Sequence, residues 1–146
     1  MSRLEVFKLN SEEFLRFLLV QSEATLRSRF YRQMTNAQIL NYSKVATTDL
    51  VYGFYDKDYS LVGVGEIIGE PEDAELALIV SEKHRGKGYS VDIISGMLDI
   101  AWCECIPQVS VFGEVTNSAL CAAVRRFADA SVREGSDMTW KINIPD

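Results

Sequence analysis

The sequence contains few prolines, histidines and cysteines. Its 146 residues include three prolines and one histidine, and it has no glycine-rich stretch that could serve as a linker. We therefore expect one domain over residues 1–146. The one histidine, His84, lies in a charged turn, which argues against a zinc site and leads us to expect a solvated side chain.

The three cysteines and the apolar runs exclude further classes. Cys103, Cys105 and Cys121 cannot all pair, and Cys103-x-Cys105 on a helix would direct its thiols to different faces, so we expect reduced cysteines and no metal. The longest apolar run, residues 14–20, is interrupted by Arg16 and is far shorter than a membrane span, and no secretion signal opens the chain. We expect a cytoplasmic protein with no membrane partner.

Positive charge is scarce overall. The net charge of −6 argues against a nucleic-acid partner, which normally meets a basic stripe. Locally, Arg27, Arg29 and Arg32 lie close together in the sequence and predict a small electropositive patch near the end of the first helix.

Hydrophobic periodicity and capping residues predict the order of the elements. Asn10 with Glu13, and Thr35 with Gln38, resemble capping boxes, and Asn117 is a good N-cap. The spacing predicts helices from Asn10 to about 28, from Thr35 to 41 or 42, from 91 to before Pro107, and over 118–128. It predicts strands at 4–9, 50–55, 60–68 and 74–80, from 109, at 131–134 and at 138–144.

The rest of the chain is organised around residues 74–90. An apolar strand runs into Arg85-Gly86-Lys87-Gly88, and an amphipathic helix follows. The first N–H groups of a helix have no partner within the helix, and glycines let an anion approach the main chain closely. The junction therefore predicts a phosphate-binding turn. The alternative is a glycine turn that only reverses the chain and binds no ligand.

The segment from Arg85 to Ser90 resembles the R-x-x-G-x-G/A signature of the GNAT superfamily of N-acetyltransferases, with Ser90 where glycine or alanine is usual. Val91 excludes the dinucleotide fingerprint G-x-G-x-x-G, and the P-loop pattern is absent. The predicted element order also matches the GNAT topology along essentially the whole chain. The resemblance implies an α/β fold with a mixed, mostly antiparallel central sheet of about seven strands flanked by about four helices.

By this resemblance the protein uses acetyl-CoA as a co-substrate. The main chain of the strand before the turn would pair with the pantetheine arm, and the amides from Gly86 to Val91 would hold the diphosphate. Asn117 would contact the cofactor, or act as a plain helix cap. The cofactor-binding residues implied are Leu78, Ile79, Val80, Arg85, Gly86, Lys87, Gly88, Tyr89, Ser90 and Asn117.

Acyl transfer to an amine needs a base, and the departing thiolate benefits from an acid. Three strand carboxylates are candidates for the base: Glu75 first, then Glu66 and Glu114, each of which can also be an ordinary solvent-facing glutamate. In many family members a tyrosine occupies the position of Val124 in this sequence and acts as the acid. Cys121 or Ser118 could donate instead, or the thiolate could leave with the help of solvent.

Two functions follow. The first is an N-acetyltransferase acting on a primary amine of a small molecule or peptide, and the alternative is a GNAT-like CoA-binding or interaction protein without turnover. The acceptor would enter near Arg27, Arg29, Arg32, Tyr31 and Tyr42. Arginines at the entrance would favour a carboxylate or phosphate on the acceptor, whereas solvent-facing arginines would leave an acidic surface suited to a polyamine. Edge strands near the C-terminus make a homodimer a further hypothesis.

Overall fold

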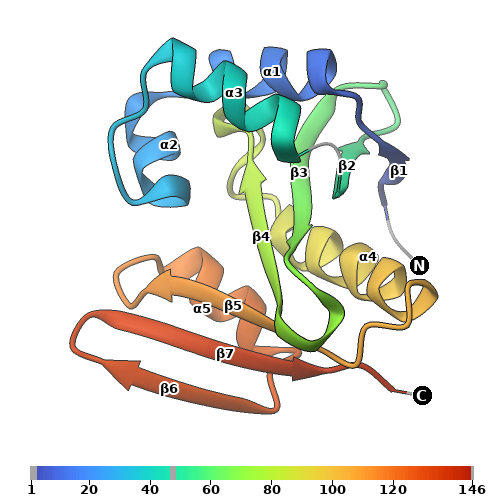
Figure 1. The fold of residues 1–146 in the computed structure, drawn as a ribbon, viewed down its shortest axis with the longest axis vertical. Coiled ribbons are helices and arrows are strands. Elements are labelled where there is room, and N and C mark those ends of the chain that lie inside the picture. The colour runs from blue at the N-terminus through green and yellow to red at the C-terminus, as the bar shows by residue number, and fades with distance from the viewer. Residues whose placement is uncertain (1–2, 47–48, 146) are drawn as a thin grey trace.

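The computed structural model describes residues 3–46 and 49–145. Their seven strands form one sheet in the order β1-β2-β3-β4-β5-β7-β6 (Figure 1). The strands are β1 Glu5–Lys8, β2 Leu50–Tyr55, β3 Leu61–Ile68, β4 Ala74–Val80, β5 Gln108–Glu114, β6 Ala130–Glu134 and β7 Asp137–Asn143. The helices are α1 Ser11–Leu19, α2 Glu23–Phe30, α3 Asn36–Ala46, α4 Tyr89–Cys103 and α5 Ser118–Arg125, with short 3-10 turns at Pro71–Asp73 and Glu82–His84.

The expected first helix is two helices. Asn10 and Glu13 form the predicted capping box at the start of α1, but the helix ends at Leu19. Ser22 then caps a second helix, because its side chain accepts a hydrogen bond from the backbone N–H of Thr25 at 3.1 Å. A serine inside an apolar-periodic run signals a new start, which periodicity alone does not reveal. The fold therefore has five helices among its described residues.

Other helix boundaries also differ from the prediction, including α4, which begins at Tyr89 rather than 91 and ends at Cys103. The box of Thr35 and Gln38 opens α3 as expected, but α3 continues to Ala46, because Ser43 and Ala46 are buried on its inner face. Helix α5 ends at Arg125 rather than near 128. Helix ends are set by tertiary packing as much as by local sequence.

Strands β4 and β5 diverge almost as soon as they meet. Strands β1 to β4 are antiparallel neighbours, and β5, β7 and β6 form a second antiparallel group. The two groups are joined by parallel pairing of β4 with β5 at only two positions, Ala74 with Val109 and Glu75 with Ser110. Beyond them β5 turns away, so the sheet opens into a V (Figure 1).

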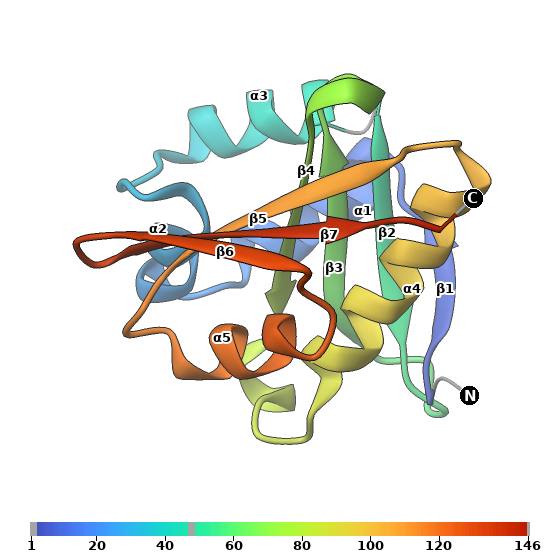
Figure 2. The ribbon, with the colours of Figure 1, turned by 90° about the horizontal axis from the view of Figure 1, so that it is seen from below.

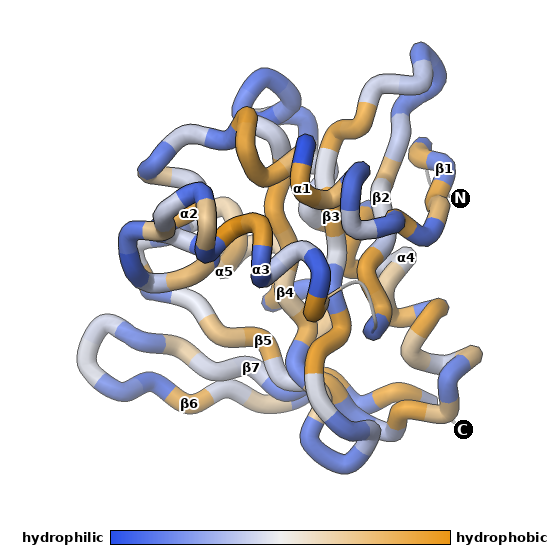
Figure 3. The backbone as a smooth tube through the Cα atoms, turned by 45° about the horizontal axis from the view of Figure 1, so that its top comes forward, coloured by the Kyte–Doolittle hydropathy of each residue, from blue (hydrophilic) through white to orange (hydrophobic). Residues whose placement is uncertain are grey.

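A hydrophobic core lies on each face of the sheet. Helices α4 and α5 pack on one face over residues such as Leu76, Val111 and Trp140, and α1, α2 and α3 pack on the other over Val64 and Ile79. Figure 2 shows the two groups of helices on opposite sides of the strands. In Figure 3 the apolar β4 contrasts with the polar tip of the β6–β7 hairpin.

A buried ion pair joins α2 to the sheet within the second core. The guanidinium of Arg29 lies 2.9 Å from a carboxylate oxygen of Glu66, and these side chains are 11% and 1% exposed. The Tyr42 hydroxyl of α3 donates to the other Glu66 oxygen at 2.6 Å and accepts from Arg29 at 2.8 Å. The network fixes α2 and α3 against β3.

We expect Arg29→Met to lower the free energy of unfolding by about 3 to 5 kcal/mol, because it leaves the buried Glu66 carboxylate without its cation. Arg27→Met on the same helix is the matched control. Arg27 pairs with Glu23 at 3.5 Å in solvent, where such a pair contributes roughly 0.5 kcal/mol or less. Urea unfolding of the three proteins measures the difference, and equal losses in both variants would contradict the role given to the buried pair.

Candidate active site

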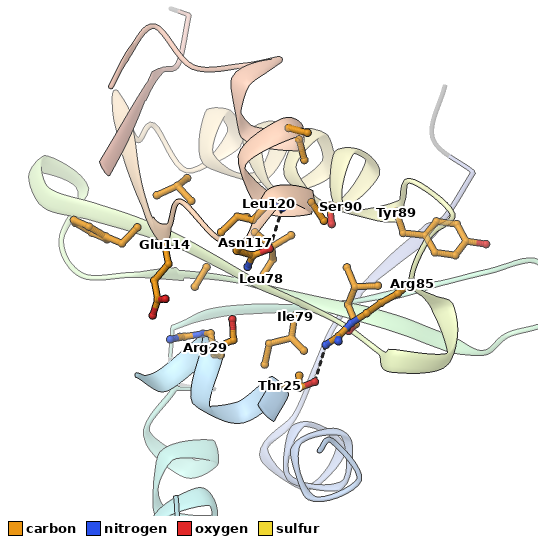
Figure 4. A pocket seen from close by; sticks show the side chains of 18 of the residues that line it. Thr25, Arg29, Leu78, Ile79, Arg85, Tyr89, Ser90, Glu114, Asn117 and Leu120 are labelled. Carbon is orange, nitrogen blue, oxygen red and sulfur yellow. Dashed lines mark hydrogen bonds between the residues drawn. The ribbon is translucent and has the colours of Figure 1, made fainter. Parts of the chain in front are cut away.

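A cleft of about 970 Å³ occupies the opening between β4 and β5. Its walls are β4, the inner face of β5, one side of α2, one side of α5 and the turn that precedes α4. Figure 4 shows Arg85 directed along this cleft toward Thr25, with Glu114 and Arg29 on the side away from the turn. The cleft exists because the two strands that bound it pair over only two residues.

The glycine turn leaves the start of α4 open. Gly86 and Gly88 have φ angles of 76° and 77°, in the left-handed region that favours glycine. No side-chain hydrogen bond caps the helix at Gly88, and no heavy atom lies within 4 Å of where a Cβ on Gly86 would be. The first N–H groups of a 15-residue helix therefore face the cleft without a side-chain cap.

Arg3 holds this turn in place. Its guanidinium donates to the carbonyl of Lys87 at 2.8 Å and to the carboxylate of Asp92 at 2.7 Å, and it lies 4.7 Å from the centre of the Tyr89 ring. This role is not predictable from the sequence, because the partners lie more than 80 residues away and no local motif connects them.

A second set of contacts joins the turn to α2. Arg85 donates to the Thr25 hydroxyl at 2.6 Å, and the Glu82 carboxylate accepts from Thr25 at 3.2 Å and from the backbone N–H of Ser22 at 2.8 Å. Ser22 and Thr25 have a recognisable capping spacing, but their long-range partner Glu82 could not be predicted from it. These contacts hold Arg85 across the mouth of the cleft.

The expectation of a solvated His84 is wrong. Its side chain is 12% exposed, and its Nδ1 is buried without a hydrogen-bond partner among the described residues. The ring packs between the β2–β3 turn, where Nε2 lies 3.9 Å from an Asp56 carboxylate oxygen, and Tyr89, at a centroid distance of 6.5 Å. The turn that contains His84 is charged in sequence, but in the structure the histidine packs against the rest of the protein.

Strand β4 has the predicted unpaired edge. Beyond Glu75, the segment that includes Leu78, Ile79 and Val80 pairs with β3 but has no partner on the β5 side. Leu78 and Val80 pack toward the α4 core, and Ile79 is buried in the other core. These side chains belong to the cores, so what this part of β4 offers the cleft is its main chain.

The three candidate carboxylates differ in their surroundings. Glu75 is half-buried in the cleft wall; burial raises the pKa of its carboxyl, Arg29 opposes that rise and Glu66 adds to it. Glu66 is fully occupied by Arg29 and Tyr42 and does not line the cleft. Glu114 lines the cleft from β5 and is exposed. Glu75 therefore keeps the first place among the candidate bases.

Among the described residues of the lining, α5 presents no acid to the cleft. Val124 is completely buried, and the Cys121 thiol is buried and directed to the carbonyls of Glu114 and Val115 at 3.6 and 3.9 Å. Ser118 is exposed outside the lining of the cleft. Asn117 lines the cleft, and its side chain accepts from the backbone N–H of Leu120 at 3.2 Å, so its capping role is satisfied.

The expected arginine patch does not form. Arg27 and Arg29 line the cleft, but the charge of Arg29 is neutralised by Glu66, and Arg32 is exposed outside the lining. Arg27 pairs instead with Glu23 on the surface of α2. Tyr31 lies at this end of α2 and lines the cleft.

Over residues 3–46 and 49–145, no helix combines the length and hydrophobicity needed to cross a membrane. Within the same ranges, no group of three histidine, cysteine, aspartate or glutamate side chains is placed to hold a metal ion. All three cysteines are free thiols.

No protein-family model matches this sequence, and no curated protein sequence does so significantly. Solved structures do match it over nearly their whole lengths. A GNAT-family acetyltransferase from Bacillus anthracis aligns with a TM-score of 0.77 and 11% identity, over 100% of this chain and 98% of its own. The chain has the GNAT fold.

Two further structures of this fold were solved with CoA. Spermidine N-acetyltransferase from Vibrio cholerae, in complex with CoA and spermine, aligns with a TM-score of 0.77 and 16% identity over 97% of this chain and 96% of its own. PaiA N-acetyltransferase from Thermoplasma acidophilum, in complex with coenzyme A, aligns with a TM-score of 0.66 and 18% identity over 98% and 99%. The GNAT fold predicted from the sequence is thus confirmed.

We expect Glu75→Gln to raise the free energy of unfolding at pH 7 and to leave it nearly unchanged below about pH 4. The pKa of Glu75 is higher in the folded protein than in the unfolded chain. The folded protein therefore loses stability as the pH rises from the unfolded-state pKa through the folded-state pKa and the carboxyl ionises. Glutamine lacks that charge at every pH. Urea unfolding at the two pH values measures the effect, and a variant less stable than wild type at pH 7 would contradict a raised pKa.

Proposed function

We propose that the protein is an acetyl-CoA-dependent N-acetyltransferase that acetylates a primary amine of a small molecule. The observation that carries the proposal is the unpaired edge of β4 beside the open N-terminus of α4. A sheet edge and a helix start present main-chain groups to one cleft, and together they suit a ligand with an amide-containing arm and a diphosphate.

The residues of the cleft fit acetyl-CoA. The main chain of Leu78 to Val80 would pair with the amides of the pantetheine arm, as a third strand does at a sheet edge. The N–H groups that follow Gly86 and Gly88 would hold the diphosphate, with the positive charge of Arg85 beside it. Lys87, which the sequence also predicts as a cofactor contact, is exposed outside the lining of the cleft. Tyr89, Ser90 and Asn117 lie close to the same groups and would contact the bound cofactor or shape its site.

Glu75 is the proposed general base. An amine is protonated at neutral pH and becomes nucleophilic only when it loses a proton. A carboxylate with a raised pKa, held in the cleft wall, is suited to accept that proton and pass it to solvent. The free backbone N–H groups of β4 near Ile79 can donate to the thioester oxygen as negative charge develops on it. Glu114, exposed on β5, would take a secondary electrostatic role toward the amine.

The charges around the cleft favour a cationic acceptor. Among the described residues of the lining, Arg29 is neutralised by Glu66 and Arg27 pairs with Glu23, while Arg85 and Arg126 lie near the turn and α5. Glu75 and Glu114 bring negative charge to the same cleft. On the open face of the sheet, Glu114 lies opposite Asp137, and Asp137 lies opposite Glu134. Of the two acceptor classes left open by the sequence, this supports an amine with further positive charge. The spermine bound by the Vibrio cholerae protein is such a molecule.

We expect the Gly88→Asp variant to bind CoA roughly 10-fold to 100-fold more weakly than Gly88→Asn, because a carboxylate at the helix start repels the diphosphate. Asparagine has the same size and tolerates a positive φ, so it controls for shape and backbone strain. Calorimetry with CoA measures both variants and the wild type. Equal affinities would show that the turn does not hold the diphosphate, and a wild type that does not bind CoA would refute the proposed function.

We expect wild type with acetyl-CoA to release free thiol when a di- or polyamine is added, and Glu75→Gln to do so about 100-fold more slowly with little change in acetyl-CoA affinity. The pH dependence of the wild-type rate should rise through the raised pKa of Glu75, because the base must be ionised. A thiol-reactive dye follows the release. Acetyl-CoA binding without release across a broad amine panel would instead favour a CoA-binding protein without turnover.

A further inference from the structure

The lining of the cleft includes the candidate base Glu75, but among the described residues α5 contributes no acid to it. The side of α5 that lines the cleft consists of Ala119, Leu120, Ala122, Ala123 and Arg126 beside Asn117. An alanine or leucine carries no transferable proton, and a guanidinium does not give one up in a protein. If acetyl transfer takes place here, the proton for the departing sulfur comes from another wall or from solvent.

Acidity narrows the choice among the hydroxyl groups of the cleft. If the CoA thiol resembles that of cysteine, its pKa is near 8.5. Among hydroxyl side chains, a phenol with a pKa near 10 has the closest pKa and stays protonated at neutral pH. The aliphatic hydroxyls of Thr25, Ser28, Ser90 and Thr116 are much weaker acids, and Thr25 is already engaged by Arg85 and Glu82. Two phenols therefore remain among the described residues of the lining, Tyr31 and Tyr89.

The two phenols lie in different parts of the cleft. Tyr89 is the first residue of α4, under the guanidinium of Arg3, and Figure 4 shows its ring directed away from the cleft beside the turn. Tyr31 follows α2 and lines both the cleft and an adjoining groove of about 500 Å³ over Phe112 and the β6–β7 hairpin. Tyr31 is thus on the acceptor side, where the candidate base also lies.

The backbone fixes Tyr31 in this place. It closes α2 with φ of 61°, a conformation that is unfavourable for a non-glycine residue, and its N–H donates to the carbonyl of Arg27 at 2.7 Å. Its side chain is 53% exposed, so solvent reaches the phenol. Burial raises the pKa of Tyr31, and the charge of Glu75 raises it further, which keeps the group protonated near the base.

We propose that Tyr31 is the catalytic acid of the acetyl transfer, an inference that rests on the proposed function. The amine nitrogen forms a bond to the acetyl carbonyl carbon, and the carbon–sulfur bond breaks with its electron pair going to sulfur. The Tyr31 phenol gives its proton to that sulfur, which leaves as the free thiol of CoA. The proton lost by the amine passes to Glu75 and then to solvent, and the phenolate recovers a proton from solvent.

The test compares Tyr31→Phe with wild type and with Tyr59→Phe. Tyr59 is a matched control, because it also has φ of 61° and is 78% exposed, but it lies in the β2–β3 turn outside the cleft. We expect Tyr31→Phe to lower kcat about 100-fold with KM for acetyl-CoA unchanged, and Tyr59→Phe to match wild type.

A second readout does not depend on turnover. The ultraviolet absorbance of the thiolate reports the ionisation of CoA bound to each protein. A phenol that donates to sulfur favours the thiolate, so bound CoA should ionise about one pH unit lower in wild type and Tyr59→Phe than in Tyr31→Phe. Binding of desulfo-CoA, which lacks the thiol, should be equal in all three.

Each result is decisive. Bound CoA that ionises at the same pH in wild type and Tyr31→Phe, or a kcat within twofold of wild type, overturns the role of Tyr31 while the proposed function stands. Bound CoA that ionises in wild type at the pH of free CoA also overturns it, whether or not the variant folds. A wild type that binds no CoA refutes the proposed function and the inference together.

Discussion

The candidate site depends on the loss of pairing between β4 and β5. Two paired positions, Ala74 with Val109 and Glu75 with Ser110, are enough to hold the two halves of the sheet in one structure. Past them, the main chain of β4 has hydrogen-bonding groups that no strand satisfies on that side, which is costly when such groups are buried and acceptable when they line a cleft. The divergence therefore creates the cavity and also the polar wall that a ligand's amides can use.

The packing around the cleft keeps it open. Arg29 and Glu66 attach α2 to β3, Trp140 lies in the core under the other half of the sheet, and Arg3 ties the turn before α4 to the first residues described. The buried ion pair is expensive to desolvate, and its value here is that it sets the position of α2 over β4. The half-burial that raises the pKa of Glu75 follows from that position, so one network both shapes the cleft wall and tunes the candidate base.

Local signals in the sequence were sufficient for the elements and for the turn. The capping boxes at Asn10 and Thr35, the apolar runs of β2 and β3 and the glycines before α4 each depend on neighbours within a few residues. The break between α1 and α2 is not apparent from periodicity, because the serine that restarts the helix lies within an apolar-periodic run. The contacts of Arg3, Thr25 and Glu82 are not predictable from the sequence, since their partners are distant in sequence. Arginine, threonine and glutamate are also common on any protein surface.

The surroundings of the three carboxylates likewise depend on contacts that are distant in sequence. All three candidates were glutamates on apolar strands, and only the fold separates a half-buried Glu75 from a neutralised Glu66 and an exposed Glu114. The cross-strand register decides this outcome, because Glu66 lies opposite Ala77 on the face that α2 covers, whereas Glu114 ends β5 beyond that cover. A residue type in a strand pattern therefore identifies candidates for proton transfer, and the position of the strand in the sheet selects among them.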